Sequence, residues 1–263
     1  MKIGIIGMGH VGSSMRDLFG AHAELITYDQ ADATPYPHDE LSTCDFAIIC
    51  VNTPPGPDGT CDTSRVVEAI KQLPTARILI KSTVTPGTTD QLITDTGKDI
   101  CFSPEYVGES TYYNPVYAQP DSVPFIILGG HPAVRGWFVD ALLPILGPTK
   151  TYFPCAAIDA EVVKYMENAF FATKITFVNE FRRICDAVGA DWHTVREGWL
   201  LDERVEPSHT AVFATAPGFD GKCLPKDLAA IVAAARGAGY QPHLLAEVLA
   251  SNSRFRSASH QPA

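Results

Sequence analysis

Short apolar runs alternate with longer amphipathic stretches through the first half of the chain. The runs are rich in Ile and Val, which is typical of strands buried on both faces. They predict strands at residues 2–6, 24–28, 46–51, 77–81 and 124–128. Strands that alternate with helices form a parallel sheet with helices on both faces.

The pattern becomes helical after Pro154. Residues 156–188 contain no Pro or Gly and carry apolar side chains on more than one face, which predicts one long helix that packs on both sides. A Pro- and Gly-containing loop is predicted at residues 203–222. Shorter helices are predicted at residues 192–201, 224–236 and 243–254.

These elements predict an α/β fold, a Rossmann-type parallel sheet followed by an all-helical region with a long central helix. We place the sheet domain at residues 1–154 and the helical domain at residues 155–256. A disordered tail is expected at residues 257–263.

The composition is that of a soluble globular protein. The chain has 263 residues, of which 46% are hydrophobic and 19% are charged. The net charge of -10 has no compensating Lys/Arg run, which argues against nucleic acid and anionic membrane surfaces as partners. Seven cysteines without regular spacing argue against a disulfide framework, and no apolar stretch approaches the roughly 20 residues that span a bilayer. With no signal-peptide cleavage site at the N-terminus, we expect a cytoplasmic protein with reduced thiols.

A glycine-rich turn directly follows the first predicted strand, with the sequence Gly7-Met-Gly9-His10-Val11-Gly12. Gly7 permits the tight turn, Gly9 lets the backbone approach a pyrophosphate, and Gly12 allows close packing of helix on strand. Asp29 ends the next predicted strand, about 20 residues on, where a carboxylate binds the ribose hydroxyls. Because Gln30 rather than Arg follows Asp29, NAD is favoured over NADP. The turn, including His10 and Val11, is therefore predicted to bind NAD.

Lys164 and Asn168 stand four residues apart in the long predicted helix, so both project from one face. A cation and an amide donor on one face can stabilise an alkoxide or a tetrahedral oxyanion. The same spacing also occurs for a solvated lysine with an incidental asparagine, so the interpretation depends on the other candidates.

Cys223 stands at the end of a glycine-rich loop and at the start of a predicted helix. The helix dipole and the neighbouring Lys222 and Lys226 favour its thiolate, the form that acts as a nucleophile. Cys61 is left open, and the remaining cysteines are interpreted as small buried hydrophobes: Cys44, Cys50, Cys101, Cys155 and Cys185. A dinucleotide site and a nucleophilic thiol together indicate a nicotinamide enzyme that can hold its product aldehyde covalently.

Further segments follow in a specific order and spacing: Val51-Asn-Thr53-Pro-Pro, Lys81-Ser-Thr83-Val-Thr-Pro-Gly, Ser103-Pro-Glu105-Tyr106-Val-Gly-Glu109, the helix at residues 161–180, Asp202-Glu-Arg204-Val and Gly221-Lys-Cys223-Leu-Pro-Lys-Asp227. With the glycine turn, they resemble the UDP-glucose dehydrogenase and GDP-mannose dehydrogenase family of nucleotide-sugar dehydrogenases. The resemblance covers nearly the whole chain.

The resemblance implies a role for each matching residue. Cys223 would be the nucleophile, Lys164 and Asn168 the oxyanion stabilisers, Asp227 a positioner of water and lysine, and Glu105 the general base for hydrolysis, with Thr83 nearby. Cofactor contacts would include Thr53, Thr83 and Glu109. Substrate contacts would be Glu105, Tyr106, Lys164, Asn168, Arg204 and Gly218. The cofactor would be NAD, with no metal ion.

The implied reaction oxidises the primary alcohol of a nucleotide sugar to a carboxylate. Two hydride transfers would proceed through a thiohemiacetal and a thioester on Cys223. Such a reaction keeps the reactive aldehyde bound to the protein.

Several features depart from the family pattern. The sequence stops where the C-terminal nucleotide-binding domain of the family would begin, so we expect that domain to be missing, to come from a separate subunit, or to lie outside a fragment of a longer protein. Asp220 and Glu206 stand where glycines are usual, and Gly108 replaces a larger residue. These changes bear on the substrate more than on the cofactor or the type of reaction.

Other functions stay open. A two-electron 3-hydroxyacid-type dehydrogenase would need Lys164 and Asn168 but not Cys223, and a non-catalytic subunit would bind NAD without reducing it. Because the long two-sided helix lacks enough partners within the chain, we also expect a homodimer.

Overall fold

The computed structural model describes residues 1–107 and 120–258. The chain forms two compact units. Unit 1 consists of Met1–Gly56 and Cys61–Lys164, and unit 2 consists of Pro57–Thr60 and Tyr165–Ala263. The long helix α6 (Ala157–Val188) therefore begins in unit 1 and continues in unit 2.

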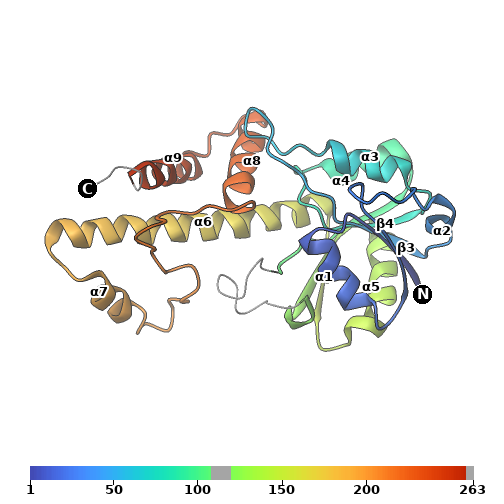
Figure 1. The fold of residues 1–263 in the computed structure, drawn as a ribbon, viewed down its shortest axis with the longest axis horizontal. Helices are drawn as coiled ribbons and strands as arrows, with labels where there is room; N and C mark the ends of the chain where they lie inside the picture. Colours follow the sequence, from blue (N-terminus) through green and yellow to red (C-terminus); the bar gives the residue numbers. More distant parts are fainter. Residues whose placement is uncertain (108–119, 259–263) are drawn as a thin grey trace. The chain divides into compact units, whose positions relative to one another are not determined.

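A seven-stranded sheet in the order β2-β1-β3-β4-β5-β6-β7 forms the centre of unit 1 (Figure 1). All neighbouring strands are parallel except β5 and β6, which pair in the antiparallel direction. Its strands are β1 (Lys2–Ile6), β2 (Glu24–Tyr28), β3 (Phe46–Ile49), β4 (Arg77–Ile80), β5 (Asp99–Phe102), β6 (Phe125–Gly130) and β7 (Thr151–Cys155).

Helices cover both faces of the sheet, because its central strands are apolar on both sides. One core cluster joins strand residues such as Ile5 to α1 (His10–Phe19) and α5 (Pro132–Leu146). The opposite cluster joins strand residues such as Ile80 to α2 (His38–Ser42), α3 (Ser64–Gln72) and α4 (Thr88–Thr96). A short 3-10 helix, Pro120–Ser122, precedes β6.

The five predicted strands are confirmed, and the Rossmann-type fold is confirmed with them. Two strands were missed, β5 and β7. β7 contains Pro154, which weakens a strand prediction, but β7 pairs only with β6 at the edge of the sheet, where the missing N–H of proline is tolerated. The β5–β6 pair is antiparallel, which the prediction of a parallel sheet did not include.

Unit 2 is helical in its described residues. Besides α6 it contains α7 (Trp192–Trp199), α8 (Leu224–Gly237) and α9 (His243–Ala258). One cluster packs Ala172 of α6 against Leu228 of α8 and Val248 of α9, and a second packs Val178 of α6 against Trp192 of α7. The single long helix and the three later helices are confirmed, to within a few residues at their ends.

The C-terminal helix continues further than the sequence suggested. Because α9 ends at Ala258, residues 257 and 258 are helical rather than part of a tail, and residues 259–263 lie outside the described part of the chain. Within the described residues, no helix combines the length and apolar character needed to cross a membrane.

Candidate functional site

The glycine turn between β1 and α1 has the geometry of a dinucleotide cradle. Gly7 adopts φ +92°, which glycine adopts without strain. A Cβ on Gly12 would lie 1.9 Å from the carbonyl oxygen of Gly7, so only glycine lets the helix approach the turn this closely. A Cβ on Gly9 would meet no atom within 4 Å, so space remains beside the backbone. Since no side chain caps the N-terminus of α1, its amide groups are placed to bind a phosphate.

Asp29 follows β2 and faces the same turn. Its Oδ2 accepts a 2.6 Å hydrogen bond from the Met8 amide, and its Oδ1 accepts a 2.9 Å bond from the Ala31 amide. The hydrogen bonds from Ala31 and Met8 lower the pKa of Asp29, although partial burial opposes them. The carboxylate is therefore ionised at neutral pH, with lone pairs left to accept bonds from ribose hydroxyls.

The other predicted cofactor residues follow neighbouring strands of the sheet. His10 is exposed and Val11 half-buried at the start of α1, after β1. Thr53 is buried after β3, and Thr83 is half-buried after β4. Because parallel strands end at the same edge of the sheet, these residues share the edge where nucleotides bind in such folds. Glu109 lies outside the described residues, as does Gly108.

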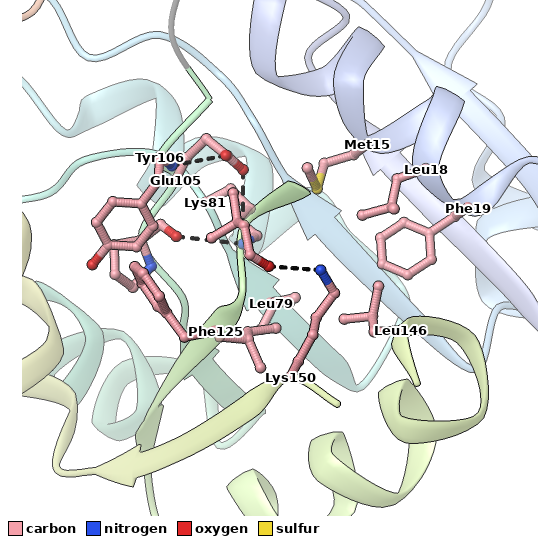
Figure 2. Close-up of a pocket in the computed structure, with 13 residues that line it drawn as sticks. Met15, Leu18, Phe19, Leu79, Lys81, Glu105, Tyr106, Phe125, Leu146 and Lys150 are labelled. Atoms are coloured by element: carbon pink, nitrogen blue, oxygen red, sulfur yellow. Dashed lines mark hydrogen bonds and ion pairs between the residues drawn. The ribbon is translucent and has the colours of Figure 1, made fainter. Parts of the chain in front are cut away.

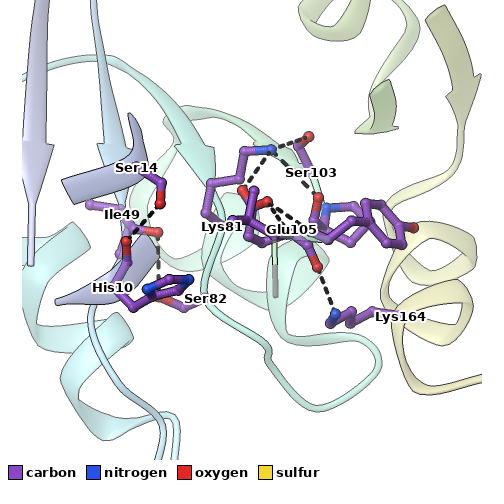
Figure 3. A network of polar contacts seen from close by, with 11 residues as sticks. His10, Ser14, Ile49, Lys81, Ser82, Ser103, Glu105 and Lys164 are labelled. Carbon is purple, nitrogen blue, oxygen red and sulfur yellow. Dashed lines mark hydrogen bonds and ion pairs between the residues drawn. The ribbon is translucent and has the colours of Figure 1, made fainter. Parts of the chain in front are cut away.

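Glu105 belongs to a polar network after β4 and β5 (Figure 3). Its Oε1 accepts hydrogen bonds of 2.8 Å from the backbone amides of Tyr106 and Val107. Its Oε2 lies 3.8 Å from the Lys81 ammonium group. These donors fix the orientation of the carboxylate, which a general base requires.

Lys164 joins this network from the first turns of α6. Its Nζ donates a 2.6 Å hydrogen bond to the backbone carbonyl oxygen of Glu105 and lies 5.2 Å from the centre of the Tyr106 ring. The structure thus brings together three residues that the sequence predicted at a substrate site. Local spacing gave no sign of this contact, because Lys164 and Glu105 are 59 residues apart.

Glu105 also lines a small apolar cavity (Figure 2). Met15, Phe19 and Leu146 line it, together with Lys81 and Glu105. Lys150 is tied at its edge by hydrogen bonds of 2.6 Å to the carbonyl oxygens of Asp121 and Val123. The cavity volume is about 40 Å³, which is far below the volume of a nucleotide sugar.

In unit 2, Cys223 is the N-cap residue of α8 and is exposed. The carbonyl oxygen of Cys223 accepts a 2.8 Å hydrogen bond from the Asp227 amide, which closes the first turn of α8. The thiol is thus accessible at the N-terminus of this helix.

Asn168 and Asp227 form a buried pair in the same unit. The Asn168 Nδ2 donates a 2.6 Å hydrogen bond to Oδ2 of Asp227, and Oδ1 of Asp227 lies 2.6 Å from the Lys226 Nζ. The exposed fractions of Asn168 and Asp227 are 6% and 2%. The Lys226 ammonium group therefore balances the charge of the Asp227 carboxylate.

The loop before Cys223 is fixed by two asparagines. Gly218 has φ +80° and its amide donates to Oδ1 of Asn179 at 2.9 Å, while Asn252 exchanges hydrogen bonds of 2.7 and 2.9 Å with the Phe219 backbone. A Cβ on Gly218 would lie 2.3 Å from Oδ1 of Asn252, which explains the glycine there. Arg204 is exposed and pairs with Asp202 at 2.5 Å.

The two acidic departures from the family pattern have cationic partners. Asp220 pairs with Arg256 at 2.7 Å, and Glu206 pairs with Lys174 at 2.9 Å. Partial burial raises the pKa of Glu206, but hydrogen bonds from Ser208 and Lys174 outweigh it and hold the pKa below its ordinary value. Each negative charge is thus balanced locally.

The remaining cysteines differ from Cys223 in burial. Cys44, Cys101 and Cys185 are buried as predicted, whereas Cys50 and Cys155 are half-buried. Burial raises the pKa of Cys101 to about 12. Cys61, which the sequence left open, is buried, and its thiol lies 3.5 Å from the carbonyl oxygen of Thr83.

Sequence reasoning assigned no role to two buried charged residues of unit 1. Lys81 lies beside Glu105, and Glu161 of α6 accepts hydrogen bonds at the N-terminus of α4 from Gly87 at 2.5 Å and Thr89 at 2.9 Å. Two features of the sequence could have pointed to these residues. Lys81 directly follows the buried strand β4, and α4 begins after Gly87, which has no side chain to cap the helix.

Two family models match the chain, and together they cover more than half of it. Residues 30–133 match the NAD binding domain of the UDP-glucose/GDP-mannose dehydrogenase family, and residues 158–254 match its central domain. The first match begins after the glycine turn, so the cradle geometry is a separate observation.

Individual relatives agree with the family models. UDP-glucose 6-dehydrogenase AglM of Haloferax volcanii is 32% identical over 79% of this chain and 52% of its own length. UDP-glucose 6-dehydrogenase of Pseudomonas aeruginosa is 31% identical over 88% of this chain and 54% of its own. This chain thus spans about half the length of these relatives.

A solved structure supports the fold. The structure of a UDP-glucose dehydrogenase from Pyrobaculum islandicum matches 96% of this chain and 68% of its own, with a TM-score of 0.80 and 23% identity. The cradle, the matched domains and the common fold lead to one conclusion: this chain belongs to the UDP-glucose/GDP-mannose dehydrogenase family and carries its NAD binding domain.

Proposed function

We propose that the protein oxidises the primary alcohol of a nucleotide sugar to a carboxylate, using two NAD and a covalent intermediate on Cys223. The observation that carries the proposal is the position of Cys223 at the N-terminus of α8, one helical turn before the buried Asp227–Asn168 pair. Family membership supports the cofactor and the type of reaction.

The proposed first stage converts the alcohol to an aldehyde. The C–H bond breaks, its hydride passes to NAD, and the hydroxyl proton passes to a water held by the site. NAD, when bound, supplies the hydride acceptor, and the cradle and Asp29 would hold it.

The proposed second stage takes place on Cys223. The thiolate adds to the aldehyde carbon, and the resulting thiohemiacetal loses a second hydride to become a thioester. Glu105 then removes a proton from water, which attacks the thioester carbon and releases the carboxylate and the thiolate. The overall balance is one alcohol, two NAD⁺ and one water giving one carboxylate, two NADH and three protons.

Lys164 and Asn168 would stabilise the oxyanions of this sequence. Asn168 uses one amide hydrogen for Asp227, which leaves a second hydrogen on Nδ2 for the substrate oxygen. Lys164 uses one of its three hydrogens for the carbonyl of Glu105. Both side chains are thus held in place with a donor still available.

A nucleotide sugar is the substrate class that the relatives' names support. Tyr106, Arg204 and Gly218 are proposed as its contacts. The local balance of Asp220 by Arg256 and of Glu206 by Lys174 removes an objection to a diphosphate nearby.

A homodimer is proposed from the exposed face of α6 within unit 2. Its large apolar side chains recur at intervals of three, four or seven residues, the spacing of one helix face: Met166, Phe170, Phe177, Phe181, Ile184 and Val188. A second copy of the chain would cover this face. Sedimentation at micromolar concentration is expected to show no dominant monomer, and a monomer would contradict the proposal.

The test of the proposed function compares Cys223→Ser with Cys185→Ser. With UDP-glucose, GDP-mannose and related nucleotide sugars as substrates, Cys223→Ser is expected to abolish carboxylate formation, and Cys185→Ser to keep it. If both variants turn over like the wild type, the thiol has no part in the reaction, and the two-electron dehydrogenase that uses Lys164 and Asn168 becomes the better account.

A further inference from the structure

Lys81 is a buried lysine whose ammonium group contacts three consecutive residues. Its Nζ lies 3.1 Å from Oγ of Ser103, 3.4 Å from the carbonyl oxygen of Pro104 and 3.8 Å from Oε2 of Glu105. Only 9% of the side chain is exposed. A buried ammonium group is costly unless several acceptors surround it, so these contacts hold residues 103–105, which follow β5, beside Lys81, which follows β4.

The Glu105 side chain is held on both oxygens. The amides of Tyr106 and Val107 bind Oε1, and the Lys81 ammonium group faces Oε2 (Figure 3). The backbone carbonyl of Glu105 accepts the hydrogen bond from Lys164. A shift of Glu105 would therefore move the acceptor that orients Lys164.

We propose that Lys81 is a positioning residue, which holds the carboxylate and the carbonyl of Glu105 in the orientation that thioester hydrolysis needs. The inference rests on the proposed function for the hydrolysis step. Its geometric part, that Lys81 holds Glu105, can be measured without turnover. Lys81 itself acts through Glu105 and not on the substrate.

Lys98 offers a matched control in the same unit. It is also partly buried, and its Nζ donates to the carbonyl oxygens of Ile70, at 2.9 Å, and Leu73. Replacing either lysine by methionine removes one charge and leaves an unbranched side chain that is one atom shorter. A general loss of stability would affect both variants, whereas a loss of Glu105 positioning would follow only Lys81→Met.

The first measurement is amide hydrogen exchange of the full chain, read at Tyr106 and Val107. Lys81→Met is expected to raise exchange at these amides about tenfold, because the carboxylate that accepts them is no longer held. Lys98→Met is expected to leave both unchanged, and Lys81→Arg, which keeps the cation, to fall between. Equal effects of the two methionine variants, or no effect of Lys81→Met, would overturn the inference.

The second measurement is the first turnover with NAD and a nucleotide sugar. In Lys81→Met, two NADH per active site are expected to form in a burst, followed by a steady rate about 10- to 100-fold below the wild type. Intact mass spectrometry is expected to show the acylated Cys223 accumulating, with the Kd for NAD changed by less than about twofold. A slow variant without accumulated thioester would overturn the hydrolytic role.

The two measurements separate the inference from the proposed function. If the wild type forms no NADH with any nucleotide sugar, the proposed function fails. The exchange rates at Tyr106 and Val107 then decide alone whether Lys81 holds Glu105.

Discussion

Asn168 of α6 donates a 2.6 Å hydrogen bond from Nδ2 to Oδ2 of Asp227 on α8. The other oxygen of Asp227, Oδ1, faces the Lys226 ammonium group at 2.6 Å, and Oδ2 accepts from Asn168, so this contact fixes which end of the Asn168 amide faces Asp227. The amide is therefore oriented before any substrate arrives, as an oxyanion stabiliser needs to be.

Asp227→Asn is predicted to disturb this arrangement. The new asparagine side chain has one acceptor oxygen, which it can offer either to Asn168 or to Lys226. Its NH₂ group then faces the other of these two donors, which loses its acceptor. The free energy of unfolding is expected to fall by about 1–3 kcal/mol, measured by urea denaturation. Asp186→Asn, at a 57% exposed side chain paired with Arg182, is the control and should change it by less than about 0.5 kcal/mol. Equal losses would show that Asp227 has no special partner.

Two glycines of the cradle are predicted to respond differently to alanine. Gly12→Ala places a Cβ 1.9 Å from the Gly7 oxygen and should destabilise the protein by about 3 kcal/mol or more. Gly9→Ala meets no atom within 4 Å and should cost no more than about 1 kcal/mol. Its Kd for NAD should nevertheless rise at least about tenfold, because the methyl group occupies the space for the pyrophosphate. Unchanged NAD binding by Gly9→Ala would mean that the phosphates lie elsewhere.

Asp29→Asn is predicted to change cofactor selection. Loss of the charge removes a strong acceptor for the ribose hydroxyls and the repulsion of a 2′-phosphate. Titration calorimetry should show about tenfold weaker NAD binding and a smaller preference over NADP. Asp32→Asn removes the same charge from a nearby exposed position and should leave the preference intact. If Asp29→Asn and Asp32→Asn lose the preference for NAD over NADP equally, the total negative charge of this region sets the preference, and the position of Asp29 does not.

Glu161 is predicted to make stability depend on pH. It is fully buried, and desolvation raises its pKa despite hydrogen bonds from Thr89 and Gly87. The folded state thus binds the proton more tightly than the unfolded state. The resulting stabilisation is complete below the unfolded pKa, near the ordinary 4.5, and is lost as pH rises through the raised folded value.

Urea denaturation between pH 4.5 and 7.5 checks the prediction for Glu161. The stability of the wild type relative to Glu161→Gln should fall with rising pH, by at most about 1.4 kcal/mol per pH unit. The exposed Glu24, replaced by Gln, is the control and should give a parallel curve to the wild type. A relative stability of Glu161→Gln that does not change with pH would contradict the assignment.

The sequence predicted elements well where local composition decides them. The Ile-rich strands and the uninterrupted helix α6 follow from short-range patterns. β7 was not predicted because it contains Pro154, and a proline is accepted in this strand because the strand lies at the edge of the sheet. The antiparallel direction of β6 depends on its pairing with β5 in the folded sheet. Neither property is encoded in neighbouring residues.

In the candidate site, too, the features that depend on neighbouring residues were predicted and the long-range contacts were not. The glycine turn and Cys223 are recognisable because each works through adjacent residues and a helix N-terminus, and Asp29 is recognisable because it directly follows a predicted strand. The contact of Lys164 with Glu105 joins residues 59 apart, and the Lys81 contacts span about 22. Such contacts exist only once the sheet places the strand ends side by side.

The ratio of NADH formed to nucleotide sugar consumed, measured with excess NAD and the full chain, tests the Cys223 pathway most directly. Two NADH per sugar, with a carboxylate as product, are predicted. One NADH per sugar, with the aldehyde or ketone released, would contradict it.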